Sequence, residues 1–180
     1  MDIYKLRFTS LQTEIFRLLC VKTGMEINQR HLAEFLKVSP TAIGNSLPML
    51  EKEGIVKVTR GRTKLNLVSL NRDSQNTLEL KRAENLRMLY ESGLPGFLEE
   101  HLPGATIVLF GSYAKGDDTT KSDIDIAAIG VNDKRLDIAK FEKQFEKEIR
   151  INYYKSQKEL DKLFLSSICN GIVLSGGIEL

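Results

Sequence analysis

Two aspartates within an apolar stretch are the residues of this chain best suited to chemistry. Asp123 and Asp125 lie one residue apart in SDIDIAAI, residues 122–129, which is otherwise apolar enough to form a buried strand. Alternate residues of a strand share a face, so both carboxylates lie on one side and Ile124 and Ile126 on the other. Burying an ionised carboxylate is costly unless a cation meets it. The pair is therefore a candidate site for a hard divalent cation.

A Gly-Ser turn lies just upstream of the aspartates. Residues 105–110, ATIVLF, predict a buried strand that runs directly into Gly111 and Ser112. The polar segment 112–116, SYAKG, is short enough to form a single helical turn. Amides at a helix start attract phosphate, and glycine lets a phosphate approach the backbone. A turn of this kind beside two carboxylates predicts a site for a nucleoside triphosphate with Mg²⁺.

The spacing of these residues resembles a family signature. GSYAKG at 111–116, then five residues, then SDIDI at 122–126 is similar to the signature of the polymerase β-type nucleotidyltransferase superfamily, above all to its minimal bacterial and archaeal members. The resemblance implies transfer of a nucleoside monophosphate by catalytic aspartates that bind Mg²⁺ or Mn²⁺. The implied catalytic and metal-binding residues are Asp123 and Asp125, and the implied nucleotide-binding residues are Gly111, Ser112, Lys115 and Ser122.

One ligand of the implied metal site is missing. After a helix expected at 134–148, many relatives carry a third carboxylate on the following strand, and in IRINYY, residues 149–154, the matching position is Asn152. An amide oxygen can coordinate a cation but brings no charge, so metal affinity should fall. Glu148 lies about 13 Å from that position along an extended strand and is not expected to substitute. Slow transfer, transfer with one tightly held metal, and nucleotide binding without transfer all stay open.

The first seventy residues predict three helices followed by a hairpin. Ser39 is expected to cap the third helix, with Pro40 in its first turn. The expected elements are helices at 10–24, 28–37 and 40–54 and strands at 55–59 and 64–70. This order resembles the winged helix-turn-helix domain of MarR-like bacterial and archaeal regulators, which implies a helix in a DNA major groove. The residues expected to contact DNA are Ser39, Thr41, Asn45, Arg60, Arg62 and Lys64.

The charge distribution and the composition of the third helix indicate what kind of partner the first seventy residues bind. Residues 1–73 carry a net charge of +5 and residues 74–180 a net charge of −3, which favours two units with different partners. Gly44 and Pro48 interrupt the third helix, and it holds few basic residues. A winged helix used for protein contacts or dimerisation therefore stays open as the alternative to DNA binding.

A long helix is predicted to join the two parts. Residues 74–93 read as one amphipathic helix whose charged stretch, 81–87, is expected to be solvated or, less simply, to form the seam of a homodimer. Asp117 and Asp118, which follow the motif glycine, are likewise expected to be solvated. The predicted division is a winged helix at 1–73, a connecting helix at 74–93 and a nucleotidyltransferase-like α/β domain with a small mixed sheet at 94–180. The fold class is α+β.

The function predicted from these parts is that of a DNA-binding transcriptional regulator whose second domain binds Mg-NTP. Two alternatives stay open: an active nucleotidyltransferase that modifies a protein or RNA acceptor, and an antitoxin-like adaptor for a helical toxin partner. The sequence holds no run apolar enough to cross a bilayer and no secretory signal. A cytoplasmic location without a membrane partner is therefore expected.

Overall fold

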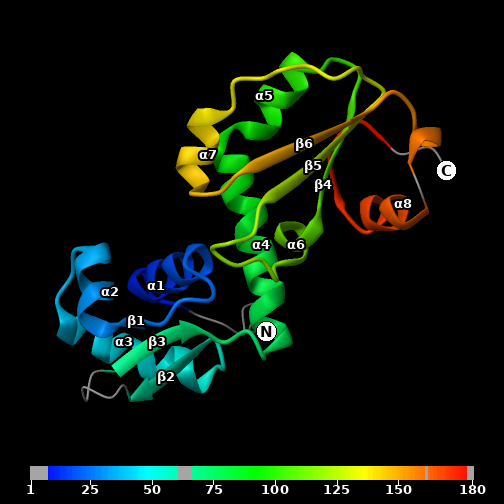
Figure 1. Ribbon diagram of the computed structural model, residues 1–180. Helices are drawn as coiled ribbons and strands as arrows, with labels where there is room; N and C mark the ends of the chain where they lie inside the picture. The colour runs from blue at the N-terminus through cyan, green and yellow to red at the C-terminus, as the bar shows by residue number, and fades with distance from the viewer. Residues whose placement is uncertain (1–7, 61–65, 161, 178–180) are drawn as a thin grey trace, which may run out of the picture. The chain divides into compact units, whose positions relative to one another are not determined.

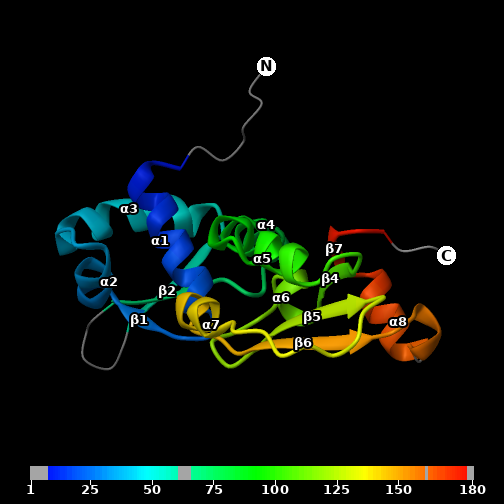
Figure 2. The same ribbon diagram turned by 90° about the horizontal axis from the view of Figure 1, so that it is seen from above.

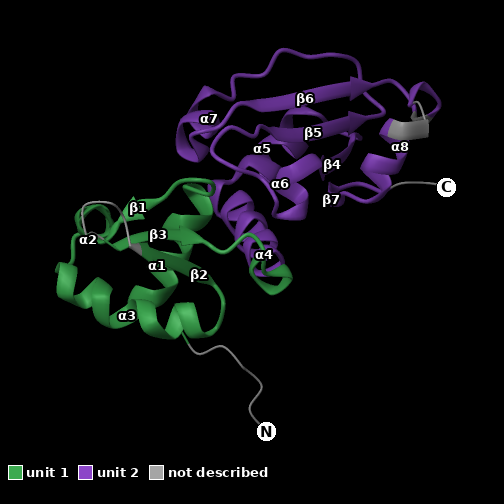
Figure 3. Ribbon diagram, turned by 60° about the horizontal axis from the view of Figure 1, so that its bottom comes forward, with its two compact units in different colours: residues 1–77 green, residues 78–180 purple. Residues whose placement is uncertain are grey.

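The computed structural model describes residues 8–60, 66–160 and 162–177 of the chain (Figure 1). These residues form helices and strands in two compact units, residues 1–77 and 78–180, which Figure 3 shows in different colours. The class is α+β, as predicted. In the described part of the chain, no helix is both long and apolar enough to cross a membrane.

The first unit is a winged helix-turn-helix. Its elements are α1 (Ser10–Val21), β1 (Ile27–Asn28), α2 (Gln29–Leu36), α3 (Pro40–Lys52), β2 (Val56–Arg60) and β3 (Asn66–Leu70). The strands form an antiparallel sheet in the order β1-β3-β2. Ser39 caps α3 as predicted, because its hydroxyl accepts a hydrogen bond from the backbone N–H of Ala42 at 3.1 Å. The two-residue strand β1 was not predicted, since it is too short to show any alternation.

The second unit is built around a mixed four-stranded sheet. Its elements are α4 (Gln75–Ser92), α5 (Leu94–His101), β4 (Thr106–Phe110), α6 (Gly111–Lys115), β5 (Ile124–Ile129), α7 (Ala139–Phe145), β6 (Ile149–Tyr154), the 3₁₀ turn η1 (Gln157–Glu159), α8 (Lys162–Cys169) and β7 (Ile172–Ser175). The strand order is β6-β5-β4-β7, and β5 and β6 run parallel while the other pairs are antiparallel. The predicted small mixed sheet is confirmed.

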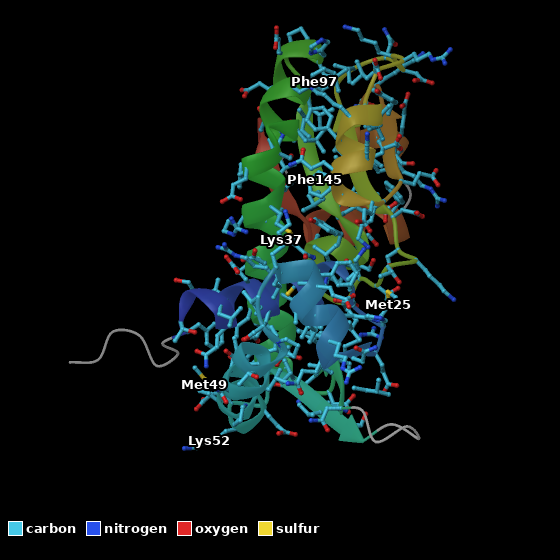
Figure 4. The ribbon with its side chains drawn as sticks, turned by 90° about the vertical axis from the view of Figure 1, so that its left-hand side faces the viewer. Met25, Lys37, Met49, Lys52, Phe97 and Phe145 are labelled. Atoms are coloured by element: carbon cyan, nitrogen blue, oxygen red, sulfur yellow. The ribbon has the colours of Figure 1, made fainter. Side chains whose placement is uncertain are left out.

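Helices cover both faces of this sheet. Residues of α4, α5 and α7 pack on one face, and α8 packs on the other (Figures 1 and 2). On the first face the aromatic rings meet in pairs: Phe97 with Phe141 at 5.2 Å between ring centroids, and Phe145 with Tyr113 at 6.2 Å. Phe97 and Phe145 are labelled in Figure 4. Burial of these large apolar surfaces is the main stabilisation of the unit.

The helix predicted at 134–148 is much shorter than expected, because only α7 (Ala139–Phe145) is helical. The preceding segment is held by contacts from elsewhere in the unit. The backbone carbonyl of Lys134 accepts a hydrogen bond from the hydroxyl of Tyr153 at 2.7 Å, and the Lys134 ammonium donates to the carbonyl of His101 at 2.8 Å. Tertiary contacts therefore override a favourable local helix propensity here.

Candidate active site

The strand β5 (Ile124–Ile129) places the two aspartates on one face of the sheet. Ile124 and Ile126 are fully buried in the core formed with α5 and α7, so the alternate residues Asp123 and Asp125 lie on the opposite face. This confirms the predicted separation of carboxylates from apolar side chains. Both aspartates remain partly exposed.

The helix α8 covers the face of the sheet that carries the aspartates. Ile168 of α8 belongs to one apolar cluster with Ala127 and Ile129, which lie on the same face as Asp125 but further along β5. This cluster also contains Phe110, the register partner of Asp125, whose ring centroid lies 5.0 Å from that of Phe164 in α8. Asp123 and Asp125 are nevertheless only half-buried. A half-buried position of this kind combines access for a ligand with a reduced dielectric constant.

Gly111 packs directly against the carboxylate of Asp125. The register of β4 and β5 pairs Phe110 with Asp125, so the next residue, Gly111, turns over that side chain. A Cβ atom at this position would lie 2.5 Å from Oδ2 of Asp125, and the φ angle of Gly111 is +76°. Both the close approach and the left-handed backbone require glycine. The Gly-Ser turn and the aspartate pair, predicted to form one site, are thus side by side.

The electrostatics of the pair favour binding of a cation. Partial burial raises the pKa of Asp125, and the negative charge of Asp123 raises it further, while Arg150 opposes the shift. Asp125 has no hydrogen-bond donor among the residues that the structure describes. A half-buried carboxylate that accepts no hydrogen bond from the described residues, beside a second carboxylate, fits a hard divalent cation with oxygen ligands. No group of three His, Cys, Asp or Glu side chains suited to a metal occurs among the described residues, so these two carboxylates are the donors that the site offers.

The third position of the predicted metal site is corrected by the strand register. In the parallel pair β5 and β6, Asn152 lies beside Ala127, whereas Arg150 lies beside Asp125. The sequence-based placement of Asn152 at the aspartates was therefore wrong by two residues, which is one step along the same face. The residue of β6 beside Asp125 is therefore an arginine and not Asn152.

Arg150 connects the aspartates to Glu148. Its Nη1 lies 3.0 Å from Oδ2 of Asp123, and its Nε lies 3.3 Å from Oε1 of Glu148. The backbone carbonyl of Glu148 accepts a hydrogen bond from Ile124, which places Glu148 near the level of Asp123. Glu148 was set aside because of its distance from Asn152, and the corrected register removes that reason. The sequence did not point to Arg150, and Glu148 was wrongly measured against Asn152, because parallel register is not encoded in either strand alone.

The other predicted nucleotide-binding residues surround the turn. Ser112 is half-buried in α6 (Gly111–Lys115), and Lys115 ends that helix with an exposed side chain. The hydroxyl of Ser122 accepts a hydrogen bond from the backbone N–H of Thr119 at 3.0 Å, which shapes the loop before Asp123. Contact of these residues with a nucleotide remains a prediction.

The second unit also contains a buried charge cluster around Asp118, the second residue after the motif glycine Gly116, which the sequence did not predict. The side chains of Lys81 and Asp118 are 0% and 1% exposed and form an ion pair. Lys147 approaches the same carboxylate, with Nζ 3.3 Å from Oδ2, and Asn85 donates to Oδ1 at 2.7 Å. The expectation that Asp118 and the stretch 81–87 are solvated was therefore wrong for these residues. The spacing of Thr77, Lys81, Asn85 and Leu89, one helical face, was the available signal.

This cluster positions the loop that leads to the aspartates. The ammonium of Lys147 also donates hydrogen bonds to the backbone carbonyls of Thr119 and Ser122, the latter at 3.2 Å. Gly116 packs on the backbone of α4, since a Cβ atom there would meet the carbonyl oxygen of Leu78 and lie 2.7 Å from the N atom of Arg82. Gly116, the second glycine of the motif, is thus required for the close packing of this loop against α4.

The residues predicted to contact DNA are partly described. Thr41 and Asn45 are exposed one turn apart on α3, and Lys52, at the end of that helix, points to solvent (Figure 4). Ser39 uses its hydroxyl as the helix cap. Arg60 is the last residue of β2, and Arg62 and Lys64 lie outside the described residues. Their contact with DNA remains a prediction.

Comparison with protein families supports the assignment of the second unit. Residues 92–173, a little under half of the chain, match the family model of the nucleotidyltransferase domain. The matched range contains the turn at Gly111, both aspartates and Arg150. The comparison with curated proteins found no match.

Several solved structures of bacterial regulators share part of the fold. They include Lactococcus lactis ZitR, a zinc-responsive MarR family member (22% identity, TM-score 0.38, covering 56% of this chain and 65% of that chain), and wild-type ZitR in complex with DNA (22%, 0.39, 56% and 64%). MepR, a transcription regulator of a Staphylococcus aureus multidrug efflux pump, is similar at 15% identity with a TM-score of 0.40, covering 54% of this chain and 67% of that chain. This chain spans about two thirds of their lengths.

Proposed function

We propose that the protein is a DNA-binding transcriptional regulator whose second unit binds a nucleoside triphosphate together with one Mg²⁺ or Mn²⁺ ion. The observation that carries the nucleotide half of this proposal is the packing of Gly111 against Asp125, with Asp123 on the same face and no hydrogen-bond donor to Asp125 among the described residues. The match of residues 92–173 to the nucleotidyltransferase domain supports the same ligand class.

The residues of the site have distinct proposed roles. Asp123 and Asp125 hold the divalent cation, and the turn at Gly111 and Ser112 lies against the phosphates. A bound divalent ion would neutralise the carboxylates and the phosphate oxygens together. Lys115, exposed at the end of α6, adds positive charge toward the triphosphate, and Ser122 holds the preceding loop through Thr119.

Nucleotide binding is proposed ahead of nucleotide transfer because of Arg150. Two-metal phosphoryl chemistry needs carboxylates for both ions, and the residue of β6 beside Asp125 is an arginine and not a third carboxylate. Transfer to a protein or RNA hydroxyl is the alternative function. A radiolabelled nucleoside triphosphate that left its label on a co-purified protein or RNA would favour that alternative.

Titration calorimetry with MgATP and MgGTP tests the nucleotide half of the proposal. The native chain is compared with the double variant Asp123→Ala, Asp125→Ala and with Asp133→Ala, which removes an exposed aspartate from a loop. We expect magnesium-dependent binding by the native and Asp133→Ala chains and loss of at least tenfold in affinity in the double variant. Absence of binding by the native chain would refute the nucleotide half.

The salt dependence of DNA affinity tests the other half. The proposal expects affinity for double-stranded DNA to fall steeply with salt, with a slope lowered by about 2 when Arg60 and Arg62 are both replaced by glutamine. Lys143→Gln, an exposed lysine of α7 in the second unit, is the matched control and should leave the slope unchanged. A slope that the double variant does not alter would contradict wing contact with phosphates.

A further inference from the structure

We infer that the guanidinium of Arg150 supplies a fixed second positive charge at the nucleotide site, in the place where a two-metal site would hold its second divalent cation. This inference rests on the proposed function, because it concerns the same carboxylates. It defines the site as one that uses a single metal ion and one arginine.

The position of Arg150 is set by the sheet. Its register partner is Asp125 on the neighbouring parallel strand, and both side chains lie on the face that carries Asp123. The 3.0 Å contact between Nη1 and Oδ2 of Asp123 makes the guanidinium a neighbour of the cation that the two aspartates would bind. An arginine side chain stays charged at all physiological pH values, so this charge is permanent.

Glu148 holds the guanidinium from the other side. Its two carboxylate oxygens lie 3.3 Å and 3.5 Å from Nε and Nη2 of Arg150, so the fork is shared between Glu148 and Asp123. Arg150 therefore bridges a carboxylate of the candidate metal site to one outside it. Without Arg150, Glu148 near the level of Asp123 would add a third negative charge to the site.

The ion pair between Arg150 and Asp123 competes with a metal ion for the Asp123 carboxylate, but the exposure of both groups shows that it does not block the ion. The Arg150 and Asp123 side chains are 55% and 26% exposed, and ion pairs of this kind contribute little to stability. A divalent ion can displace such a partner from Asp123, yet it must do so against the repulsion of a nearby positive charge. Metal affinity in the absence of nucleotide is thus held low, and the triphosphate gains a guanidinium that can pair with its oxygens.

Mn²⁺ binding to the full chain, followed by electron paramagnetic resonance of the free ion, tests the inference. We expect Arg150→Gln to bind Mn²⁺ about tenfold more tightly than the native chain, because a like charge has been removed. Arg150→Asp should bind it more tightly still. Arg135→Gln, an exposed arginine on the segment before α7, is the control and should match the native chain.

Nucleotide affinity should move in the opposite direction. At saturating Mn²⁺, Arg150→Gln is expected to bind a non-hydrolysable ATP analogue about tenfold more weakly, since it has lost a charged donor to phosphate. Glu148→Gln keeps the guanidinium and should lose no more than twofold. Circular dichroism of each variant confirms that the fold is retained.

The failures of the two ideas are distinguishable. If the native chain binds Mn²⁺ and nucleotide but Arg150→Gln binds Mn²⁺ no more tightly, the role of Arg150 is overturned and the nucleotide site stands. If neither chain binds Mn²⁺ or nucleotide, both the proposed function and this inference are overturned.

Discussion

The second unit contains two charged clusters whose aspartates, Asp118 and Asp123, are five residues apart in the sequence. The two clusters differ in burial and in how completely their charges are paired. Asp118 is buried, and its two oxygens are shared among Lys81, Lys147 and Asn85. Asp123 and Asp125 are partly exposed, and between them the described residues provide one arginine, which is itself shared with Glu148. The first cluster satisfies its charges internally and thereby fixes a loop. The second leaves charge unsatisfied, which costs stability and creates capacity to bind.

The strongest test of this contrast is removal of the buried carboxylate. Asp118→Ala would leave two buried lysines facing each other without an anion, and we expect a loss of about 3–5 kcal/mol in the free energy of unfolding. Urea denaturation followed by circular dichroism measures it. Asp133→Ala should change the same quantity by less than about 0.5 kcal/mol. Equal stability of Asp118→Ala and the native chain would show that the cluster does not hold the unit together.

A smaller loss is expected where the motif packs on α4. Gly116→Ala places a methyl group against the backbone of Leu78 and Arg82 at a φ angle of +80°, and should cost about 2 kcal/mol or more. Gly96→Ala is the matched control, because a Cβ atom meets nothing within 4 Å in the helix α5. That variant should gain about 0.5–1 kcal/mol. Thermal unfolding of both variants gives the comparison, and a stable Gly116→Ala would contradict the close helix contact.

The smallest effect is expected at the open cluster and has the opposite sign. Folding raises the pKa of Asp125 through burial and the charge of Asp123, so the folded state binds its proton more tightly than the unfolded state. The resulting destabilisation is fully present above the folded pKa and is relieved as pH falls through it toward the unfolded value. Asp125→Asn should therefore raise the melting temperature by about 2 °C at pH 7.

The pH dependence separates this cause from others. The advantage of Asp125→Asn over the native chain should shrink as pH is lowered toward the pKa of a free aspartate, near 4. Differential scanning calorimetry from pH 7 to pH 3.5 measures the trend. If the difference in melting temperature between Asp125→Asn and the native chain stayed constant over this range, the raised pKa of Asp125 would not be its cause.

Much of this arrangement was predictable because it depends on local signals. Helix caps such as Ser39, the alternation of Ile124 and Ile126 with the aspartates, and the Gly-Ser turn are all written in short stretches. Asn152 was wrongly expected beside the aspartates, because the register between β5 and β6 depends on how the connecting segment packs. The burial of Lys81 escaped prediction for a related reason: its partner, Asp118, lies 37 residues away in the sequence.

The polar inner face of α4 determines where the chain could be cut to transfer one unit into a chimeric protein. The hydroxyl of Thr77 donates to the carbonyl of Gly54 in the first unit, while Lys81 and Asn85, one and two turns later, complete the Asp118 cluster of the second. A recombination joint placed after α4 would give the transplanted second unit an incomplete interior, because Asp118 would lose its contacts with Lys81 and Asn85. A joint at the first turn of the helix would transfer it whole. The natural seam between these modules therefore lies inside a continuous helix, and not at its end.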